Sequence, residues 1–392
     1  MPDILPPSDV LLLDVSRLIW RKWTGRLPTG IDRVCLAYLD HYGPSARAVI
    51  QRGELRAVLT FADSQRLFGL LAAGNPRFRA RLLALLARAL PAALSHKPPS
   101  RAIYLNIGHT GLDTPGLPAW IARNRLRAVY LIHDLIPIYA PEFCRAGEAE
   151  KHVRRMTNAL TSAAGIIANS DATLRELQRF AAERDLPYPP AIAAWLAGPP
   201  LPKTIVPPAD PHPYFITIGT IEGRKNHIML LRLWQRLARD MGEQTPRLVV
   251  VGQRGWESDH ALAMLDRGRD LDAVQELRRC GDAELAGLIK GARALLMPSF
   301  AEGFGLPVIE ALQLGTPVIA SDLPVFREIA GDIPTYIASY DPRSWERHIK
   351  EFIGLSLERD RQIQAISAYR APDWPGHFTA VDGYLEEFEA RI

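Results

Sequence analysis

The sequence predicts an α/β protein with two open parallel-sheet domains in tandem. The chain has 392 residues, enough for two domains of roughly 100–200 residues each. Short apolar runs alternate with helical patterns, which is typical of parallel sheets covered by helices. Prolines crowd the run from Pro187 to Pro213, and because proline interrupts helices and sheets alike we expect the linker there.

The expected elements follow this alternation on both sides of the linker. In the helix that follows the GIIANS run, Ser170 or Asp171 is the expected N-cap. The predicted strands are 10–15, 128–134, 165–170, 214–220, 247–252, 294–299 and 316–321, and the predicted helices are 34–42, 172–183, 227–239 and one after Gly305.

Composition excludes several classes of protein. With 47% apolar and 23% charged residues, the chain is not expected to be disordered. It holds no stretch of 18 uncharged apolar residues, so no membrane-spanning helix is expected, and residues 1–7 do not resemble a signal peptide. Three distant cysteines argue against a disulfide framework or a zinc ribbon. We therefore expect a cytoplasmic protein, either free or peripheral on the inner face of the membrane.

The charges are unevenly distributed. Through Ile205 there are 26 basic and 16 acidic residues, against 21 and 27 afterwards. This favours a basic first domain that faces an anionic membrane surface or an anionic ligand, although unequal surface charge without a partner fits equally well. The net charge of +4 does not favour nucleic acid. A helix expected over 76–90 carries arginines on one side and leucines on the other, and either a membrane or the protein core would suit it. The arginines are Arg77, Arg81 and Arg88, and the leucines are Leu82, Leu83, Leu86 and Leu90.

The stretch SFAEGFGLPVIEALQLGTPVIASD (299–322) carries the most chemical information. Residues Glu302–Gly305 form a tight loop after a strand, and a helix begins near Leu306. Gly303 and Gly305 allow backbone N–H groups at the helix N-terminus to approach an anionic ligand. Glu302 in the loop and Glu310 in the helix can face one crevice, where carboxylates are good acceptors for sugar hydroxyls.

These residues resemble retaining glycosyltransferases of GT-B architecture, in the large family 4. YFITIGTIEGRKNHIMLL, SDATLREL, IHDLIPIYAPEF and PTGIDRV are similar to further segments of that family, whereas residues 40–100 match nothing in it. The resemblance implies two Rossmann-like domains facing across a cleft. They would comprise residues 1–205 and 206–370, with a C-terminal helix in 371–392 that packs back on the first.

The resemblance also implies roles for single residues. Glu302 would hold hydroxyls of the transferred sugar and Glu310 the ribose, while Arg224 and Lys225 would neutralise the donor pyrophosphate. Two adjacent cations suit a leaving diphosphate on physical grounds as well, although a solvated surface pair is the plain alternative. His133 would contact the donor sugar or the acceptor, and Asp134 would orient His133 or bind the acceptor. Backbone contacts to the donor would come from Gly219, Thr220, Gly303, Phe304, Gly305, Leu306 and Gly30, the last of which is equally compatible with a simple turn.

The expected activity is transfer of a hexose, with retention, to a saccharide or lipid-linked acceptor in surface polysaccharide assembly. Mannose from GDP-mannose is the first choice, with UDP- and dTDP-sugars open. No further cofactor is expected, and no metal, because no D-x-D pair follows an apolar strand.

Three alternatives remain open. They are a GT-B-fold scaffold that binds nucleotide or sugar without turnover, a sugar-nucleotide epimerase, and a dinucleotide-dependent oxidoreductase. The last lacks a G-x-G-x-x-G after an early strand.

Overall fold

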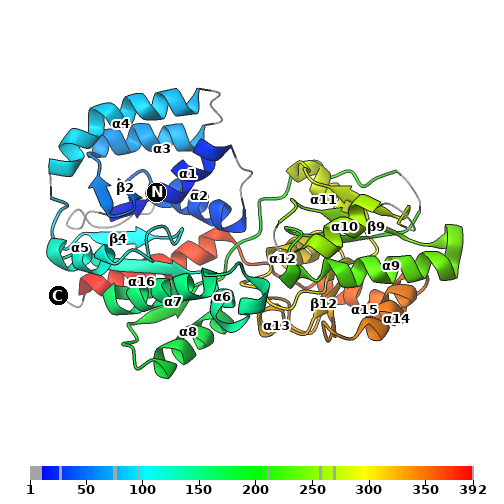
Figure 1. The fold of residues 1–392 in the computed structure, drawn as a ribbon. Coiled ribbons are helices and arrows are strands. Elements are labelled where there is room, and N and C mark those ends of the chain that lie inside the picture. The colour runs from blue at the N-terminus through cyan, green and yellow to red at the C-terminus, as the bar shows by residue number, and fades with distance from the viewer. Residues whose placement is uncertain are drawn as a thin grey trace. The chain divides into compact units, whose positions relative to one another are not determined.

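The computed structural model describes residues 11–25, 29–73, 77–95, 97–209, 212–255, 258–267 and 271–390. The chain divides into two compact units (Figure 1). Unit 1 comprises the residues up to Ile138, Ala149–Trp195 and those from Trp374 onwards, and unit 2 comprises Tyr139–Glu148 and Leu196–Asp373. The sequence places the boundary at 205/206 instead. Residues 1–7, which do not resemble a signal peptide, and Pro28 of the PTGIDRV segment lie outside the described residues.

Unit 1 is built on a seven-stranded sheet in the order β3-β2-β1-β4-β5-β6-β7. All neighbours run parallel except β2 and β3, which form an antiparallel hairpin in the region that matched no family segment. The strands are β1 (Leu11–Asp14), β2 (Arg47–Arg52), β3 (Leu55–Val58), β4 (Ile103–Asn106), β5 (Arg127–Ile132), β6 (Ala163–Ala168) and β7 (Ala191–Ala193).

The helices of unit 1 include the last helix of the chain, α16 (Trp374–Ala390). Tyr384 of α16 donates its hydroxyl to Pro190 O and accepts from Ile166 N–H, and Asp382 accepts from the Tyr42 hydroxyl at 2.6 Å. The others are α1 (Ser16–Thr24), α2 (Gly30–Tyr42), α3 (Phe61–Ala72), α4 (Phe78–Ser95), α5 (Gly116–Asn124), α6 (Ile136–Tyr139), α7 (Glu148–Ser162) and α8 (Asp171–Glu183), with a 3-10 turn η1 (Pro141–Phe143) in the segment that groups with unit 2.

Unit 2 is built on a fully parallel six-stranded sheet in the order β10-β9-β8-β11-β12-β13. Counted from its own first strand, this is the 3-2-1-4-5-6 order of nucleotide-binding α/β domains. In such sheets ligands bind where the order reverses, which here is between β8 and β11. The strands are β8 (Tyr214–Ile218), β9 (Arg247–Val251), β10 (Val274–Leu277), β11 (Leu295–Met297), β12 (Val318–Ser321) and β13 (Thr335–Ile337).

Helices lie on both faces of this sheet. Helix α9 packs against α10 and α14, and α12 packs against α11 and α13. The core under α9 and α14 includes the fully buried Phe215, Trp234 and Trp345. The helices are α9 (His227–Met241), α10 (Asp259–Arg267), α11 (Asp282–Gly291), α12 (Leu306–Gln313), α13 (Pro324–Ala330), α14 (Pro342–Ile353) and α15 (Leu357–Ile366), with 3-10 turns η2 (Gly223–Lys225) and η3 (Gly242–Gln244).

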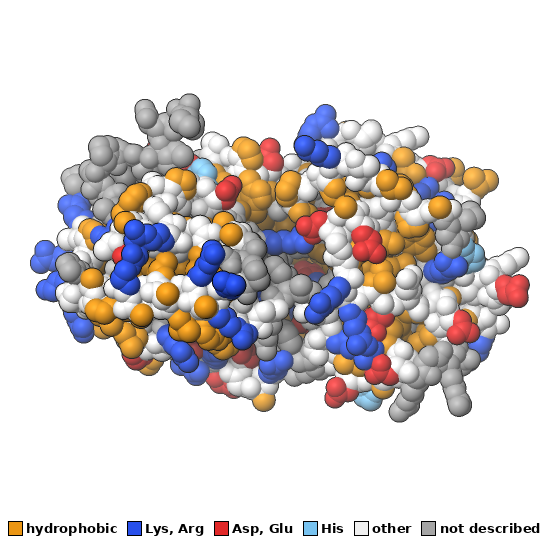
Figure 2. Space-filling model, turned by 90° about the horizontal axis from the view of Figure 1, so that it is seen from above, with side chains coloured by type: hydrophobic (Ala, Val, Ile, Leu, Met, Phe, Trp, Pro, Cys, Tyr) orange, Lys and Arg blue, Asp and Glu red, His pale blue; other side chains and the backbone are white. Residues whose placement is uncertain are grey.

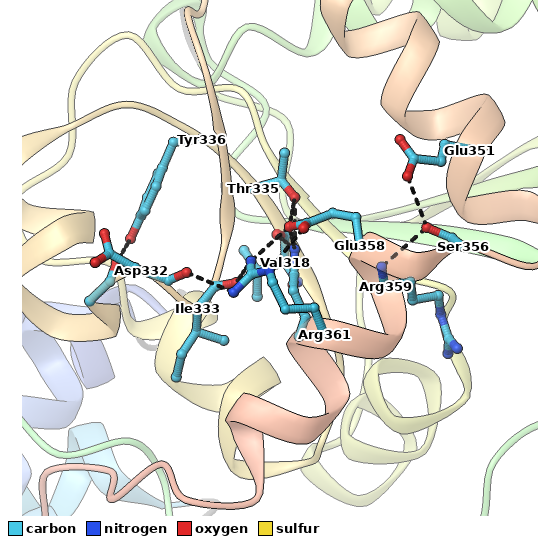
Figure 3. A network of polar contacts seen from close by, with 12 residues as sticks. Val318, Asp332, Ile333, Thr335, Tyr336, Glu351, Ser356, Glu358, Arg359 and Arg361 are labelled. Atoms are coloured by element: carbon cyan, nitrogen blue, oxygen red, sulfur yellow. Dashed lines mark hydrogen bonds and ion pairs between the residues drawn. The ribbon is translucent and has the colours of Figure 1, made fainter.

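Polar side chains of α15 fasten it to the edge of this sheet (Figure 3). Glu358 accepts from the Thr335 hydroxyl at 2.8 Å, and Arg361 donates to Ile333 O at 2.9 Å. The buried Gln362 accepts from Val318 N–H and donates to Val318 O, so it satisfies the backbone of β12 just before the residues that pair with β13.

Most predicted elements are confirmed within one to three residues, including Ser170 as the N-cap of α8. One expectation is wrong. The proline-rich run does contain a strand, because β7 pairs with β6 at the sheet edge, where proline is tolerated. In α4, the alternative that the leucines face the protein core holds for Leu82, which is 2% exposed, but not for Leu83, which is 55% exposed.

Two expectations from composition can be compared with the structure. Cys35, Cys144 and Cys280 are not joined to one another by disulfide bonds in the structure. Within the described part of the chain, no helix combines the length and apolar content that crossing a bilayer requires.

Candidate active site

Two loops of unit 2 meet at the point where its strand order reverses. One follows β8 and contains Arg224 and Lys225, and the other follows β11 and contains Glu302. The loops are joined by the backbone, because Phe300 N–H donates to Arg224 O at 2.8 Å. Asn226, in the left-handed conformation, adds a side-chain bond to Pro298 O. The predicted residues of the diphosphate and sugar sites are therefore neighbours.

Four charged side chains form the centre of this site. Arg224 contacts Glu222 Oε1 through Nε at 2.6 Å and Glu302 Oε2 through Nη1 at 2.8 Å. Lys225 Nζ lies 2.5 Å from Glu302 Oε1. The Ser299 hydroxyl donates to the same oxygen at 2.6 Å. The cluster thus contains two carboxylates and two cations, and neither carboxylate side chain is more than 6% exposed.

Glu302 is fully charged at neutral pH. Burial alone would raise the pKa of its carboxyl group, but the nearby Lys225 and Arg224 outweigh burial and lower the pKa to about 2. A buried carboxylate that is held by three donors has a fixed position and a fixed charge.

The loop after β8 is shaped around Lys225. Gly219 has φ 142°, and a Cβ there would lie 3.2 Å from Lys225 Cε. The absence of a side chain at this position leaves room for the lysine to reach Glu302. Thr220 follows and is half-buried.

Helix α12 begins at Leu306, as predicted, with Pro307 in its first turn. Gly305 has φ 107°, and an added Cβ would meet Phe326 at 2.7 Å, so only glycine fits there. Gly303 precedes it in the loop, and Phe304 buries its side chain in the core. Glu310, one turn into α12, is 8% exposed.

His227 is a site residue that the sequence analysis missed. It is the first residue of α9 and is buried, and neither ring nitrogen has a hydrogen-bond partner among the described residues. Burial and the adjacent Lys225 lower its pKa to about 3, so the ring is neutral at physiological pH.

His133 and Asp134 lie in unit 1, at the carboxyl end of β5. His133 Nε2 donates to Ile107 O at 2.8 Å, which leaves Nδ1 as the acceptor. Burial lowers the pKa of His133 to about 4. The Asp134 carboxylate accepts from Ile136 N–H instead, so the Ile107 carbonyl, not Asp134, orients the ring.

Gly30, also in unit 1, is the first residue of α2. A capping box between Thr29 and Asp32 closes the first turn of this helix. Asp32 is buried and contacts both Arg17 and Arg21 at 2.7 Å. This aspartate of the PTGIDRV segment therefore balances charge within unit 1.

Glu222, Ser299 and His109 also belong to these sites, although the sequence analysis did not single them out. Glu222 stands two residues before Arg224, and Ser299 three before Glu302, so their signal is short spacing to a residue already chosen. His109 lies with its ring centroid 5.1 Å from that of His133 and is bonded to Leu131 O.

The fold is that of GT-B proteins, as predicted. The chain is similar to sucrose-phosphate synthase from Thermosynechococcus elongatus, with a TM-score of 0.64, 15% identity, and coverage of 97% of this chain and 100% of that one. It is also similar to an α,α-trehalose-phosphate synthase (UDP-forming) from Burkholderia vietnamiensis, with a TM-score of 0.59, 11% identity and coverage of 97% and 100%. At these identities the likeness concerns the fold.

Sequence similarity relates most of the second unit to glycosyltransferases. Residues 203–368 match the family model described as "Glycosyl transferases group 1". The O-antigen chain mannosyltransferase B of Escherichia coli is 31% identical over 224 residues, 55% of this chain and 58% of that protein. The serotype-specific mannosyltransferase WbdA of Escherichia coli is 28% identical over 245 residues, 58% of this chain and 30% of that protein. The chain thus matches less than two thirds of either relative.

Proposed function

We propose that the protein is a retaining hexosyltransferase that uses a nucleoside-diphosphate sugar. Mannose from GDP-mannose is the first choice, because the similar proteins include mannosyltransferases. The acceptor is a saccharide or a lipid-linked saccharide of a surface polysaccharide. The observation that carries the proposal is the Arg224–Lys225–Glu302 cluster at the reversal point of the unit 2 sheet.

The proposed chemistry needs charge stabilisation more than a nucleophile. As the bond between the anomeric carbon and the phosphate oxygen breaks, the acceptor oxygen bonds to the same face of the sugar. The leaving phosphate oxygen takes the acceptor's proton. Arg224, Lys225 and the first amides of α12 stabilise the developing diphosphate charge. Glu302 holds hydroxyls of the sugar and Glu310 holds the ribose. In unit 1, His133 accepts a hydrogen bond from a substrate hydroxyl through Nδ1.

The first test is thermal unfolding with GDP, UDP, dTDP and CMP. A nucleotide at about 100 times its Kd adds roughly 2.7 kcal/mol. At about 2–4 °C per kcal/mol, the melting temperature then rises by several degrees. One nucleoside diphosphate should give this shift, and Lys225→Ala should lose it. Absence of a shift with all four would contradict the donor site.

A second test separates a transferase from a non-catalytic scaffold. The protein is incubated with GDP-mannose, UDP-glucose or dTDP-rhamnose and a lipid-linked saccharide, and release of nucleoside diphosphate is measured. A transferase releases it with formation of glycosylated acceptor, and the anomeric configuration of the product tests retention. Binding of a nucleotide without any release would favour the scaffold.

The outer face of helices α3 and α4 is the proposed contact with an anionic membrane. Figure 2 views the molecule from above Figure 1 and shows Lys and Arg side chains beside exposed hydrophobic ones over unit 1. Leu83 and Leu94 of α4 and Phe61 of α3 are each more than half exposed. In a flotation assay, the protein should rise with vesicles of phosphatidylglycerol and should not rise with vesicles of phosphatidylcholine. Leu83→Glu should lower the fraction of protein bound to phosphatidylglycerol vesicles. Equal binding of the wild type to both kinds of vesicle would contradict the proposal.

A further inference from the structure

The two cations of the candidate donor site already have anionic partners within the protein. Arg224 is shared between Glu222 and Glu302, and Lys225 contacts Glu302 at 2.5 Å. Two carboxylates and two cations give the cluster no formal net charge. A diphosphate that is to bind both cations must therefore compete with a carboxylate for them.

The carboxylate that competes with the diphosphate for these cations is Glu302 rather than Glu222. Glu302 contacts both cations with its two oxygens, as an anionic diphosphate would. Glu222 occupies the Nε of Arg224, whereas Glu302 occupies Nη1, so Arg224 can keep Glu222 while it exchanges Glu302. Glu302 also sits on the loop that leads into α12, where the N-terminal amides lie.

We propose that the Glu302 carboxylate is an internal competitor of the diphosphate. It holds Arg224 and Lys225 until a diphosphate displaces it, and it then becomes available to hydroxyls of the donor sugar. This inference rests on the proposed function, because it assumes that the diphosphate binds at these two cations.

This competition affects the affinity for the intact donor and the affinity for the released nucleotide differently. With the intact donor, sugar hydroxyls replace the ion pairs that Glu302 gives up. A bare nucleoside diphosphate offers Glu302 no such replacement, so its binding is weakened by the competition. Product release is thereby favoured over donor release.

The test is isothermal titration of the full chain with GDP and UDP, comparing wild type with Glu302→Gln. Glutamine has nearly the same shape without the charge, so the variant should bind its nucleoside diphosphate more tightly, on the order of tenfold. The same variant should lose turnover. If the folded variant binds the diphosphate equally or more weakly than wild type, the competition does not exist.

Glu346→Gln is the matched control. Glu346 of α14 contacts Lys350 at 2.8 Å and Arg236 at 3.3 Å, so the same substitution removes the same kinds of ion pair outside the site. Its affinity for the diphosphate should equal that of wild type. If Glu346→Gln raised this affinity as much as Glu302→Gln does, the inference would be overturned.

Two further variants keep the result interpretable. The double variant Glu302→Gln with Lys225→Ala should bind the diphosphate more weakly than Glu302→Gln alone, since one of the two cations is gone. Ser299→Ala removes one donor to Glu302 at unchanged charge and should also tighten diphosphate binding, which tests the inference should Glu302→Gln not fold.

If wild type binds a nucleoside diphosphate and Lys225→Ala does not, the proposed function stands whatever Glu302→Gln does. If no variant binds any, both proposals fail.

Discussion

At the scale of single residues, Glu302 joins the chemistry of the site to its electrostatics. It is buried, ionised and held by Lys225, Arg224 and Ser299. If its carboxylate acts on the sugar in the transition state, Glu302→Ala should lower kcat on the order of 10²-fold or more. Steady-state kinetics with the donor found by thermal unfolding would measure this. A kcat near that of wild type would contradict the role.

Lys225→Ala has a different expected signature. Lys225 would neutralise the diphosphate both in the bound donor and in the transition state, so the donor's KM should rise and kcat should fall together. Kinetics unchanged from wild type would remove Lys225 from the phosphate site.

The site was predictable where chemistry is tied to fixed spacing. Arg224, Lys225, Glu302 and Glu310 stand in recognisable segments, and the structure brings the first three into contact. Their partners were not predictable, because the contact of Arg224 with Glu222 depends on the 3-10 turn η2 that bends the chain between them. The histidine pair of unit 1 likewise forms only when β4 and β5 are adjacent.

At the scale of elements, helix α12 depends on the glycines at its two ends. Gly305→Ala combines a positive φ with a Cβ 2.7 Å from Phe326, and it should destabilise unit 2 by about 3 kcal/mol. Gly315, with φ 78°, has no atom within 4 Å of an added Cβ. Gly315→Ala should therefore cost only about 1 kcal/mol. Thermal unfolding compares the two, and equal losses would show that the contact with Phe326 has no effect.

Helix α16, at the end of the chain, should stabilise unit 1, whose other described residues all precede residue 196. Leu385 is fully buried, and Leu385→Ala should cost about 2–5 kcal/mol. Hydrogen exchange should show the loss in strands β5 and β6 of unit 1 but not in β8 and β9. The exposed neighbour Glu386 provides the control, since Glu386→Ala should change little. A loss confined to unit 2 would contradict the grouping of α16 with unit 1.

Elements were predictable where local pattern and tertiary role agree. The strands flanking the sites are continuous apolar runs, as buried parallel strands require. Strand β7 was missed because its place at a sheet edge, not its sequence, makes the neighbouring prolines acceptable. Which leucines of α4 are buried was not predictable from the sequence, because the helices that pack against it, α1 and α3, decide which side is covered.

At the scale of the whole molecule, alternation of strands and helices predicts the fold class but not the chain's division into units. The order of the strands does not follow from this alternation either, since β11 follows β10 in the chain but lies between β8 and β12 in the sheet. No local sequence pattern predicts that residues 139–148 group with unit 2. A stack between Phe143 and Phe300, with centroids 4.9 Å apart, joins this segment to the loop before Glu302.

The molecule as a whole should lose stability on mild acidification. Burial lowers the pKa of His133 and His377 to about 4, of His227 to about 3, and of His109 well below its usual value. In the unfolded chain these rings titrate near 6.5, so between that pH and their folded pKa the unfolded state binds more protons. Stability is complete above about pH 6.5 and is lost as the pH falls towards 4, by up to about 2 kcal/mol per ring between pH 7 and 5.

The melting temperature between pH 7 and 5 measures this effect. The ionised Glu302, with a pKa of about 2 against about 4.3 when unfolded, loses its contribution only at lower pH, so it does not interfere. His227→Gln should flatten the pH dependence, because glutamine binds no proton in either state. His260 is exposed, and His260→Gln should leave the slope unchanged. A melting temperature constant from pH 7 to 5, or equal flattening by both variants, would contradict the assignment of buried neutral rings.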